Sequence, residues 1–560
     1  MKTKIIISSL AIILIALFAF KILFFRIDLT EEKRYTISKN SKELLKNLQE
    51  PLRVNIYLGE ADANIAKLRT AVNEMLDEFS AYSAKPLSYK YIDPSKAASD
   101  KERYQNYDRL EARELTPMTV SVRDAKGAMS QQIIFAWAEI FTEKDTVPVC
   151  LMQPLGKMSG EENVNSAIEN LEYEFIDAIR LLTKKSFDKI AFLEGHGELE
   201  EIETYGAQIQ LERYYDVYRG TLGDTASMLN DFKAVIIAKP TEPFSESDKF
   251  IIDQYIMNGG KVLWLIDAIR LSPEELAKSG MSPIVPLELN LTDMLFRYGI
   301  RVEPSVVQDM QCILTPVNVA LPTEPAHFEQ VPFPYYPLLM PSPYHSITKN
   351  LMQVKCEFPS YLSQVSDENG IEMEVLLITS NAARVDAAPT NIDLKTMVQS
   401  KPEEYFVMQY IPVAVAMEGN FESVFAHRLP PRNLVDMPPR KDKSAKNRMI
   451  VVADGDIIRN EIDRSKKNTI GIVPLGLDRL TGQTYGNANF IVNALQYLTE
   501  ETSWLEMRNR ALRPRLLNKL TITQHRTFWQ TINIVAPLLL LGLFGGGFIF
   551  FRKRRNINNF

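Results

Sequence analysis

The sequence predicts an α/β protein that is anchored in a membrane at both ends. Short apolar strands alternate with amphipathic helices through the middle of the chain, and one long apolar stretch stands near each terminus. Each stretch has about 20 residues, which as a helix crosses a hydrocarbon core of about 30 Å. We therefore expect a large soluble body between two membrane spans, at residues 5–25 and 532–551.

Basic residues in the tails predict the orientation. Lys2 and Lys4 precede the first span, and the run RKRR at 552–555 follows the second. Short basic segments tend to stay in the cytoplasm, whereas long domains cross largely regardless of their charge. We expect both termini in the cytoplasm and most of the chain on the opposite side of the membrane. The alternative for residues 5–25 is a cleaved signal peptide, although no small-x-small site follows.

Composition excludes some classes of protein. The chain has 560 residues and a net charge of −6, so it offers no basic field for nucleic acid. Cys150, Cys312 and Cys356 are too few and too scattered for a disulfide framework or a zinc site. Three buried, unreactive thiols are favoured, and one disulfide beside one free thiol stays open.

Following the N-terminal anchor at 1–27, residues 28–155 have the pattern of a first extracytoplasmic α/β domain. Ser38 is placed to cap a helix that runs to about residue 48. The helix at 64–82 carries an apolar stripe, and a bridging helix within 156–185 begins its periodic pattern at 165. The expected strands are 53–58, 87–92, and a hairpin of 119–123 with 131–142.

Residues 186–505 have the clearest α/β signature. The runs at 189–193, 233–238 and 261–267 are short and apolar, as in a sheet covered on both faces. Helix-length connections between them predict parallel pairing, with the following loops gathered at the carboxyl edge of the sheet. A strand at 449–453 and a helix at 489–498 complete the domain.

Two proline-rich stretches interrupt this order, and a basic linker ends it. Residues 315–346 hold eight prolines among aromatic residues, for which an irregular loop is favoured over an exposed surface that docks a partner. Residues 429–447 are basic and predict a solvated loop. A juxtamembrane linker at 506–531 leads to the second span and its tail at 532–560.

Acidic residues and a histidine follow the predicted strands, at the edge where α/β sheets place ligands. A histidine among carboxylates could bind a metal or transfer protons, but no second histidine is near in sequence. Residues 454–456 resemble a calcium loop, yet Ile457 and Ile458 stand where ligands are needed. Structural turns are favoured and no metal is expected. The candidate ligand or interaction residues are Glu194, His196, Glu198, Asp267, Asp454 and Asp456.

Catalytic motifs are missing from the sequence. There is no Gly-x-Ser-x-Gly elbow, and neither Gly156-Lys157 nor Gly260-Lys261 has the leading glycine and hydroxyl of a phosphate-binding loop. We therefore expect a protein that is not an enzyme and holds no cofactor. If it works with ATP, a separate subunit must supply the nucleotide site.

Five short motifs stand in a particular order along the chain. They are residues 28–38 (DLTEEKRYTIS), 192–198 (FLEGHGE), 412–419 (PVAVAMEG), 451–456 (VVADGD) and 486–490 (GNANF). This order resembles the GldG family, the gliding-motility-associated auxiliary subunits of ABC-transporter-like complexes in Bacteroidetes. The resemblance implies a GIFT-type, amidotransferase-like sheet in the second domain, without the catalytic cysteine of amidotransferases. It also implies a location in the bacterial inner membrane with a periplasmic body, a permease partner, an ATPase partner, and a link to gliding and type IX protein secretion.

The combined prediction is a non-catalytic, membrane-anchored scaffold or auxiliary subunit. Small residues in a span allow close helix packing, and the second span offers Gly542, Gly545, Gly546 and Gly547 for contact with a permease. The alternative is a periplasmic solute-binding protein or an envelope hydrolase that uses the loop of Glu194, His196 and Glu198.

Overall fold

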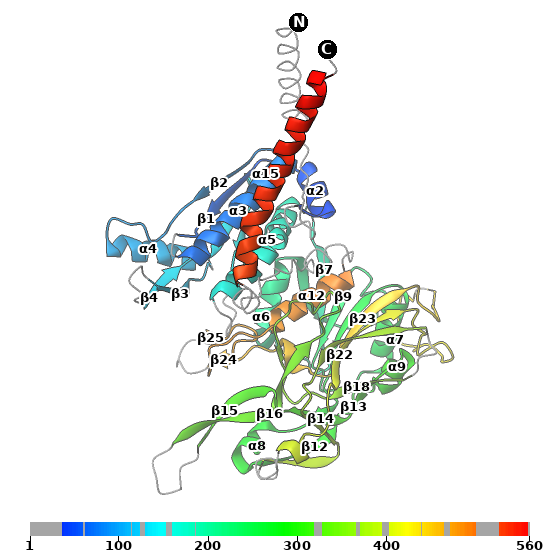
Figure 1. The fold of residues 1–560 in the computed structure, drawn as a ribbon. Coiled ribbons are helices and arrows are strands. Elements are labelled where there is room, and N and C mark those ends of the chain that lie inside the picture. Colours follow the sequence, from blue (N-terminus) through cyan, green and yellow to red (C-terminus); the bar gives the residue numbers. More distant parts are fainter. Residues whose placement is uncertain are drawn as a thin grey trace. The chain divides into compact units, whose positions relative to one another are not determined.

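The computed structural model shows two compact units, Met1–Arg510 and Ala511–Phe560 (Figure 1). It describes residues 36–557, with gaps at 60–61, 114, 124–128, 153–159, 185, 319–326, 366–369, 395–401, 438, 464–470 and 500–525. The expected span at 5–25 therefore lies outside the described residues. So does most of the expected linker at 506–531.

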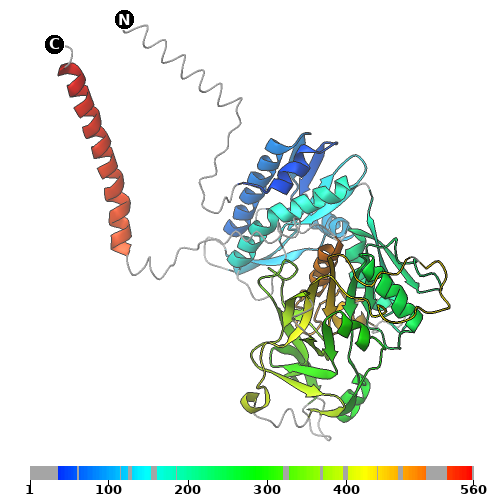
Figure 2. The same ribbon diagram turned by 90° about the vertical axis from the view of Figure 1, so that its right-hand side faces the viewer.

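The N-terminal layer, residues 36–183, packs helices on a four-stranded sheet with the order β2-β1-β5-β6. Strands β1 (Leu52–Ile56) and β2 (Leu87–Tyr91) are parallel, whereas β5 (Trp137–Phe141) and β6 (Thr146–Cys150) run antiparallel to their neighbours. Figure 2 shows helices α3 (Ala63–Tyr82) and α5 (Gly160–Thr183) side by side. Their apolar faces and the sheet enclose a core of their own.

Most predicted elements of this layer are confirmed. Helix α2 (Lys39–Lys46) begins after Ser38, whose hydroxyl accepts the Ser41 N–H at 3.1 Å. The predicted hairpin forms from β3 (Met118–Arg123) and β4 (Met129–Ile134). The single strand expected at 131–142 is wrong, because the chain breaks into β4 and β5 at residues 135–136. Helix α4 (Asp100–Glu111) and strand β6 were not predicted.

The large sheet has ten strands, nine of them in the order β15-β16-β19-β22-β23-β10-β9-β7-β8. Its parallel part confirms the prediction from the apolar runs. This part contains β8 (Tyr215–Thr221), β7 (Asp188–Glu194), β9 (Ala234–Ala238), β10 (Lys261–Leu265) and β23 (Asn447–Val452).

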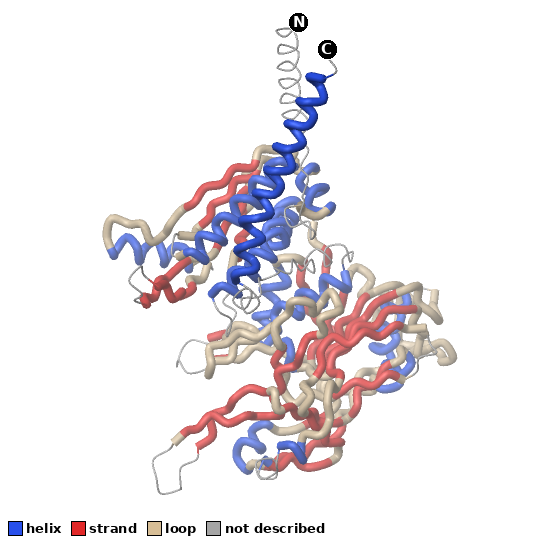
Figure 3. The backbone as a smooth tube through the Cα atoms, viewed as in Figure 1, coloured by secondary structure: helices blue, strands red, loops and turns tan. Residues whose placement is uncertain are grey.

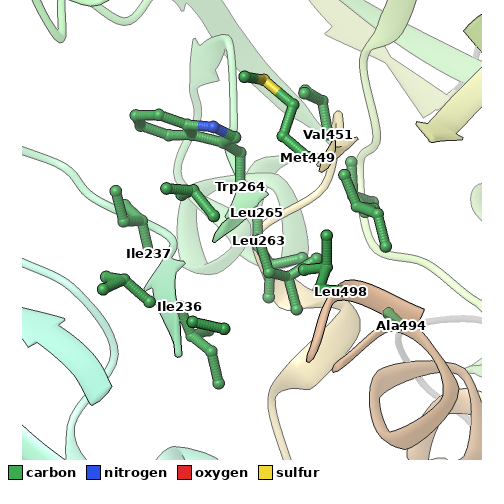
Figure 4. Close-up of a cluster of buried hydrophobic side chains, with 14 of the residues drawn as sticks. Ile236, Ile237, Leu263, Trp264, Leu265, Met449, Val451, Ala494 and Leu498 are labelled. Carbon is green, nitrogen blue, oxygen red and sulfur yellow. The ribbon is translucent and has the colours of Figure 1, made fainter. Parts of the chain in front are cut away.

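Helices bury both faces of the parallel part. Helix α12 (Asn487–Thr499) contacts β9, β10 and β23, and also lies against α6 (Glu201–Glu212), while α7 (Glu246–Met257) contacts β10. Every residue of β9 is buried, as expected for a strand covered on both sides. Figure 4 shows Leu263 and Trp264 of β10 in this core, with Leu498 of α12 nearby.

The antiparallel half of the sheet corrects one expectation. The proline-rich stretch at 315–346 is mostly not a loop, since it forms β15 (Cys312–Asn318) and the long strand β16 (Phe328–Pro341), which Figure 3 shows as an arm of paired strands. Phe333, Tyr335 and Tyr336 pack around Phe358, and this burial favours the strand. The sheet continues through β19 (Glu372–Ile378) and β22 (Pro412–Gly419).

Shorter helices and strands lie in the same region of the chain as the large sheet. They are β11 (Ile269–Arg270), α8 (Pro273–Ser279), β12 (Met281–Pro286), α9 (Thr292–Arg297), β13 (Ile300–Glu303), β14 (Ser305–Asp309), β17 (Val354–Lys355), β18 (Tyr361–Gln364), β20 (Ala383–Ala387), β21 (Thr390–Asp393), α11 (Pro402–Tyr405), the 3-10 helix η1 (Asp456–Ile458), β24 (Ile462–Asp463) and β25 (Gly471–Ile472). The described residues of 429–446 contain no helix or named strand, as expected for a loop.

The three cysteines are free. Cys356 is buried, and burial raises the pKa of its thiol well above the usual value. Cys150 and Cys312 are half-buried rather than buried, yet burial still raises the pKa of each thiol to about 12. All three thiols are protonated and weakly nucleophilic at neutral pH.

The second unit contains helix α15 (Arg526–Ile557). Its stretch Arg526–Ile549 has 24 residues, and the most apolar 18 of them in a row have a mean hydropathy of 2.1, so its length and composition suit a membrane crossing. The predicted second span at 532–551 lies within this helix. Large apolar side chains along it are exposed, with Phe544 at 83%. This helix suggests membrane association.

Candidate functional site

The six predicted site residues lie at or just after the ends of parallel strands. Glu194 is the last residue of β7, Asp267 follows β10, and Asp454 follows β23. Because β7, β9, β10 and β23 are parallel neighbours, their loops meet at one carboxyl edge of the sheet. The loop after β9, which begins at Lys239, belongs to the same edge.

Three of these residues form an acid cluster, which we define as Asp267, Asp454 and Asp456. One carboxylate oxygen from each lies within 4.8 Å of the others. Asp454 and Asp456 are buried, and Asp267 is half-buried. Three carboxylates this close repel one another strongly in a buried setting, so the cluster requires positive charge or protons.

Lys239 supplies positive charge to the acid cluster. Its ammonium lies 3.4 Å from Asp267 Oδ2 and forms a hydrogen-bonded ion pair with Asp456. Lys239 has a φ of +56°, a strained conformation for a residue with a Cβ. The Cβ and Cγ of Lys239 also lie so close to Gly455 that a side chain at 455 would collide with them. The loops are therefore shaped around this lysine.

Arg459 and the backbone complete the pairing of the acid cluster. Arg459 Nε lies 2.7 Å from Asp456 Oδ1, and the Gly455 N–H donates to Asp267 Oδ1 at 2.6 Å. Asp454 accepts the N–H of Glu357 at 3.0 Å and the N–H of Asp456 at 2.8 Å. The oxygens of the cluster are thus directed at groups of the chain itself, although Asp456 Oδ1 meets Arg459 as an ion pair without a hydrogen bond.

The pKa shifts follow from this arrangement. Burial raises the pKa of Asp454 well above its usual range, and the charges of Asp456 and Asp267 add to the rise. Burial raises the pKa of Asp456 to about 6, against the opposing effect of Lys239. For Lys239, burial works to lower the pKa, but Asp267 and Asp456 outweigh it and raise the value. Lys239 stays charged, and a proton on Asp454 relieves part of the remaining repulsion.

The donor chemistry of the acid cluster could suit Mg²⁺ or Ca²⁺, which prefer carboxylate oxygens. Here, however, the Lys239 ammonium lies against two of the three carboxylates. A divalent ion would have to displace this ammonium and tolerate the nearby Arg459. The cluster is therefore built as an internal ion-pair network and fits a metal poorly.

The ionic network extends beyond the acid cluster to the segment around β17. Glu357 lies 2.5 Å from Arg459 and 3.1 Å from Lys355, and Lys355 lies 3.1 Å from Glu461. Burial acts to raise the pKa of Glu357, but Lys355 and Arg459 hold it below its usual value. Asn487 joins the same loops, because its amide donates to the carbonyls of Lys355 at 2.8 Å and Ile457 at 3.0 Å.

His196 stands in a separate arrangement. Its Nδ1 lies 3.2 Å from Glu198 Oε1 and its Nε2 lies 3.2 Å from Asp248 Oδ2. The ring stacks on Phe244 with 3.7 Å between centroids, and the imidazole is buried. Burial acts to lower the pKa of His196, but its hydrogen bonds to Glu198 and Asp248 outweigh it and raise the value. Both ring nitrogens are engaged, so neither is free to transfer a proton to a substrate.

Two glycines allow the His196 loop to close on its neighbour. Gly195 and Gly197 have φ values of +108° and +70°, which favour glycine. A Cβ at Gly197 would also collide with the hydroxyl of Thr241. The His196 carbonyl accepts the N–H groups of Thr241 at 2.8 Å and Glu242 at 2.9 Å. The loops after β7 and β9 thus fill the crevice where the strand order reverses, the usual ligand site of such sheets.

The structure therefore divides the predicted residues into three places. The acid cluster brings Asp267, Asp454 and Asp456 together, and His196 pairs with Glu198. Glu194 lies apart, in an ion pair with Arg219 at 2.7 Å. The loop from Lys239 to Thr241 touches both of the other groups.

Comparison with known proteins identifies the large sheet. Residues 188–494, more than half of the chain, match the family described as ABC-type uncharacterized transport system. The chain belongs to this family. Residues 31–141, most of the N-terminal layer, match a domain family of unknown function, DUF7088. The transport-system match runs from β7 into α12, so it includes the acid cluster, Lys239 and His196.

Two individual proteins are also similar to this chain. An uncharacterized protein of Borreliella burgdorferi is 21% identical over 466 residues, which cover 80% of this chain and 81% of that protein. The mmIFT52 N-terminal domain is similar in structure with a TM-score of 0.33 and 14% identity, covering 56% of this chain and 98% of that domain. At this TM-score the structural likeness carries no inference about function.

Sequence reasoning missed Lys239, Arg459 and Asp248, the partners of the predicted residues. Lys239 had a usable signal, because it follows a buried strand at the same edge as Asp267. Arg459 stands three residues after Asp456, the spacing of one helical turn. Asp248 lies in the first turn of α7, and nothing local in the sequence connects it to His196.

Proposed function

We propose that this protein is a non-catalytic, membrane-anchored auxiliary subunit of an ABC-type transport complex. Family membership supports the transport assignment, and α15 supports attachment to a membrane. The observation that carries the non-catalytic role is that the chain's own groups occupy the candidate residues at the carboxyl edge of the large sheet, where the cavity beside Asp267 holds only about 100 Å³. Lys239 occupies the acid cluster, and His196 is held by two carboxylates.

A filled edge suits a subunit that relays force or position. Enzymes with such sheets bind substrate in a crevice at the carboxyl ends of the strands. Here ion pairs and loop contacts join β7, β9, β10 and β23 across that crevice. Buried ion pairs resist separation, because breaking one leaves an uncompensated charge. The sheet and its loops can then move as one body.

The same proposal assigns partners and location. An ATPase subunit supplies the nucleotide site that this sequence lacks, and a multi-span permease packs against α15. Gly542, Gly545, Gly546 and Gly547 leave open space on that helix, which a second helix can enter. We place both termini in the cytoplasm and most of the chain in the periplasm. The GIFT-type assignment and a role in gliding motility and type IX secretion rest on the GldG resemblance.

Affinity purification tests the proposed function. The tagged full chain is extracted from its native membranes in mild detergent, and the co-eluting proteins are identified by mass spectrometry. We expect an ATPase and a multi-span permease. Gly546→Leu should lower permease recovery at least about threefold by blocking close packing, while Leu541→Ile on the same helix should not. Elution of the chain without either partner would contradict the proposal.

A further inference from the structure

The N-terminal layer contains a cleft of about 450 Å³. It lies beyond the carboxyl ends of the parallel strands β1 and β2, next to α4 and β4. Its lining residues are Tyr57, Gly59, Asp93, Pro94, Ser95, Arg103, Tyr104, Tyr107 and 131–135. We refer to it as the β4 cleft.

The edge of β4 forms one wall of this cleft. Five consecutive residues line the cavity, namely 131–134 of β4 and Phe135 directly after it. Side chains alternate between the two faces of a strand, so consecutive residues line one cavity only when it runs along the strand's edge. Among the described strands, β4 pairs with β3 on one side and with none on the other. An unpaired edge presents backbone N–H and C=O groups for another strand.

Aromatic rings form the opposite walls. Tyr57 is fixed in place, because its hydroxyl donates to Glu139 at 2.6 Å and Arg113 lies 2.8 Å from the same carboxylate. The rings of Tyr104 and Tyr107 pack edge to face, with 6.4 Å between centroids. Tyr104 is 59% exposed, so its ring is available to a ligand. Rings held in advance lower the entropic cost of binding an apolar side chain.

Arg103 contributes a positive charge to the cleft, and the other charged lining residue, Asp93, is bound by Ser95 and ion-paired with Lys96. The Arg103 guanidinium lies 2.9 Å from Asp100, whose side chain is 81% exposed. A pair this open to water is weak and can exchange for another carboxylate. Because guanidinium groups bind carboxylates in a planar, two-pronged geometry, Arg103 favours an acidic residue on the ligand.

We propose that the β4 cleft binds an extended, acidic segment of a partner protein, which pairs with β4 as an added strand. The backbone of the segment bonds to the edge of β4, an aromatic or large aliphatic side chain lies against Tyr104 and Tyr107, and a carboxylate meets Arg103. Only a polypeptide backbone supplies the alternating donors and acceptors that a strand edge requires. This binding site is independent of the role proposed for the large sheet.

Fluorescence anisotropy with labelled peptides tests this proposal on the full chain in detergent. The probes are fluorescein-labelled octapeptides that alternate phenylalanine or valine with glutamate, together with copies that carry glutamine in place of glutamate. The phenylalanine–glutamate peptide should bind. Methylating alternate backbone nitrogens along the pairing edge should weaken binding at least about tenfold, since each lost hydrogen bond costs about 1 kcal/mol.

Two substitutions locate the site. Tyr104→Ala should weaken the phenylalanine–glutamate peptide about fivefold or more, whereas Tyr344→Ala, at a tyrosine that is 92% exposed in the large-sheet region, should not. Arg103→Gln should remove the preference for glutamate over glutamine. The proposal fails if no peptide binds or if methylated peptides bind equally. It also fails if the chain alone sediments as a dimer that Ile133→Asp dissociates, because a second copy would then occupy the edge.

Discussion

The carboxyl edge of the large sheet and the β4 cleft have the same position relative to their strands but differ in what occupies that position. Each lies beyond the carboxyl ends of parallel strands, where α/β proteins bind ligands. In the large sheet, Lys239 and the His196 loop fill this position with groups of the chain. In the N-terminal layer, the same position holds a cleft of about 450 Å³ walled by Tyr57 and Tyr104.

This difference indicates that the two places have different roles. Paired charges make the large-sheet edge rigid, because a buried charge that loses its partner destabilises the folded protein. Leaving the β4 cleft open, with fixed rings and a free strand edge, prepares it for a partner. The following predictions test whether paired charges stabilise the large-sheet edge and whether the charge in the β4 cleft contributes little to stability.

The largest effect is expected at Lys239. Lys239→Met leaves the acid cluster without the cation that contacts two of its members, and removing one partner of a buried pair costs about 3–5 kcal/mol. At about 2–4 °C per kcal/mol, the melting temperature of the large sheet should fall by roughly 10 °C. Differential scanning fluorimetry of the full chain measures this change.

A matched variant in the β4 cleft provides the control for Lys239. Arg103→Gln removes a cation whose partner, Asp100, is largely in water, so it should change stability by less than about 1 kcal/mol. If both substitutions lowered stability equally, the claim that only the large-sheet edge is stabilised by its own ion pairs would be contradicted.

The pH dependence of His196 should be the next largest effect. Its pKa is raised in the folded protein, so its stabilising contribution is complete below the unfolded value of about 6.5 and is lost as pH rises through the folded pKa. The stability gap between the wild type and His196→Gln should therefore be about 1.5–3 kcal/mol at pH values below about 6 and shrink toward pH 9. Thermal melts across this range measure the gap.

The stability contributed by His345 should change with pH in the opposite direction, so His345 serves as the control for His196. Burial lowers the pKa of His345 to about 4, so its contribution is present above the unfolded value of about 6.5 and is lost as pH falls toward 4. Two histidines with the same pH trend would show that the carboxylates around His196 do not set its charge.

Substitution of Gly197 should lower the free energy of unfolding by a similar or smaller amount. Gly197→Ala requires a left-handed conformation of alanine and a collision with Thr241, at a cost of about 1–3 kcal/mol. Gly223→Ala meets nothing within 4 Å and should be close to neutral. Chemical denaturation of both variants measures the difference, and equal stabilities would show that the two loops are not locked together.

The smallest effect concerns calcium. In the wild type, Lys239 occupies the acid cluster, so neither calcium nor a chelator should shift the melting temperature. In Lys239→Met the carboxylates are released, and about 5 mM Ca²⁺ should restore roughly 1 kcal/mol if it binds with a Kd near 1 mM. Stabilisation of the wild type to the same degree would show that the cluster is a metal site after all.

The sequence predicted the parallel core of the large sheet well, because buried strands leave continuous apolar runs. It also named Asp267, Asp454 and Asp456 as separate candidates at strand ends, but it did not predict that the three form one cluster. It did not reveal Lys239 as their partner, because that role depends on a left-handed backbone and on the approach of Gly455. Such features arise only when distant loops meet.

Helix α4 and strand β16 escaped prediction for different physical reasons. Helix α4 is highly charged and buries only Tyr107 and Leu110, so its apolar face leaves a faint pattern. Strand β16 contains four prolines, which favour loops, yet the burial of Tyr335 against Phe358 holds it extended. In the β4 cleft the strand was predicted, but only the strand pairing among the described residues shows that one edge of β4 has no partner strand.

Photoaffinity labelling of the purified complex tests the central claim most directly. The complex is irradiated with 8-azido-ATP, and the labelled chains are separated and identified. A carboxyl edge closed by Lys239 and His196, in a chain without a phosphate-binding loop, predicts that the label appears on a co-purifying ATPase and that this chain stays unlabelled. Specific labelling of this chain, competed by ATP, would contradict the claim that it is a non-catalytic subunit.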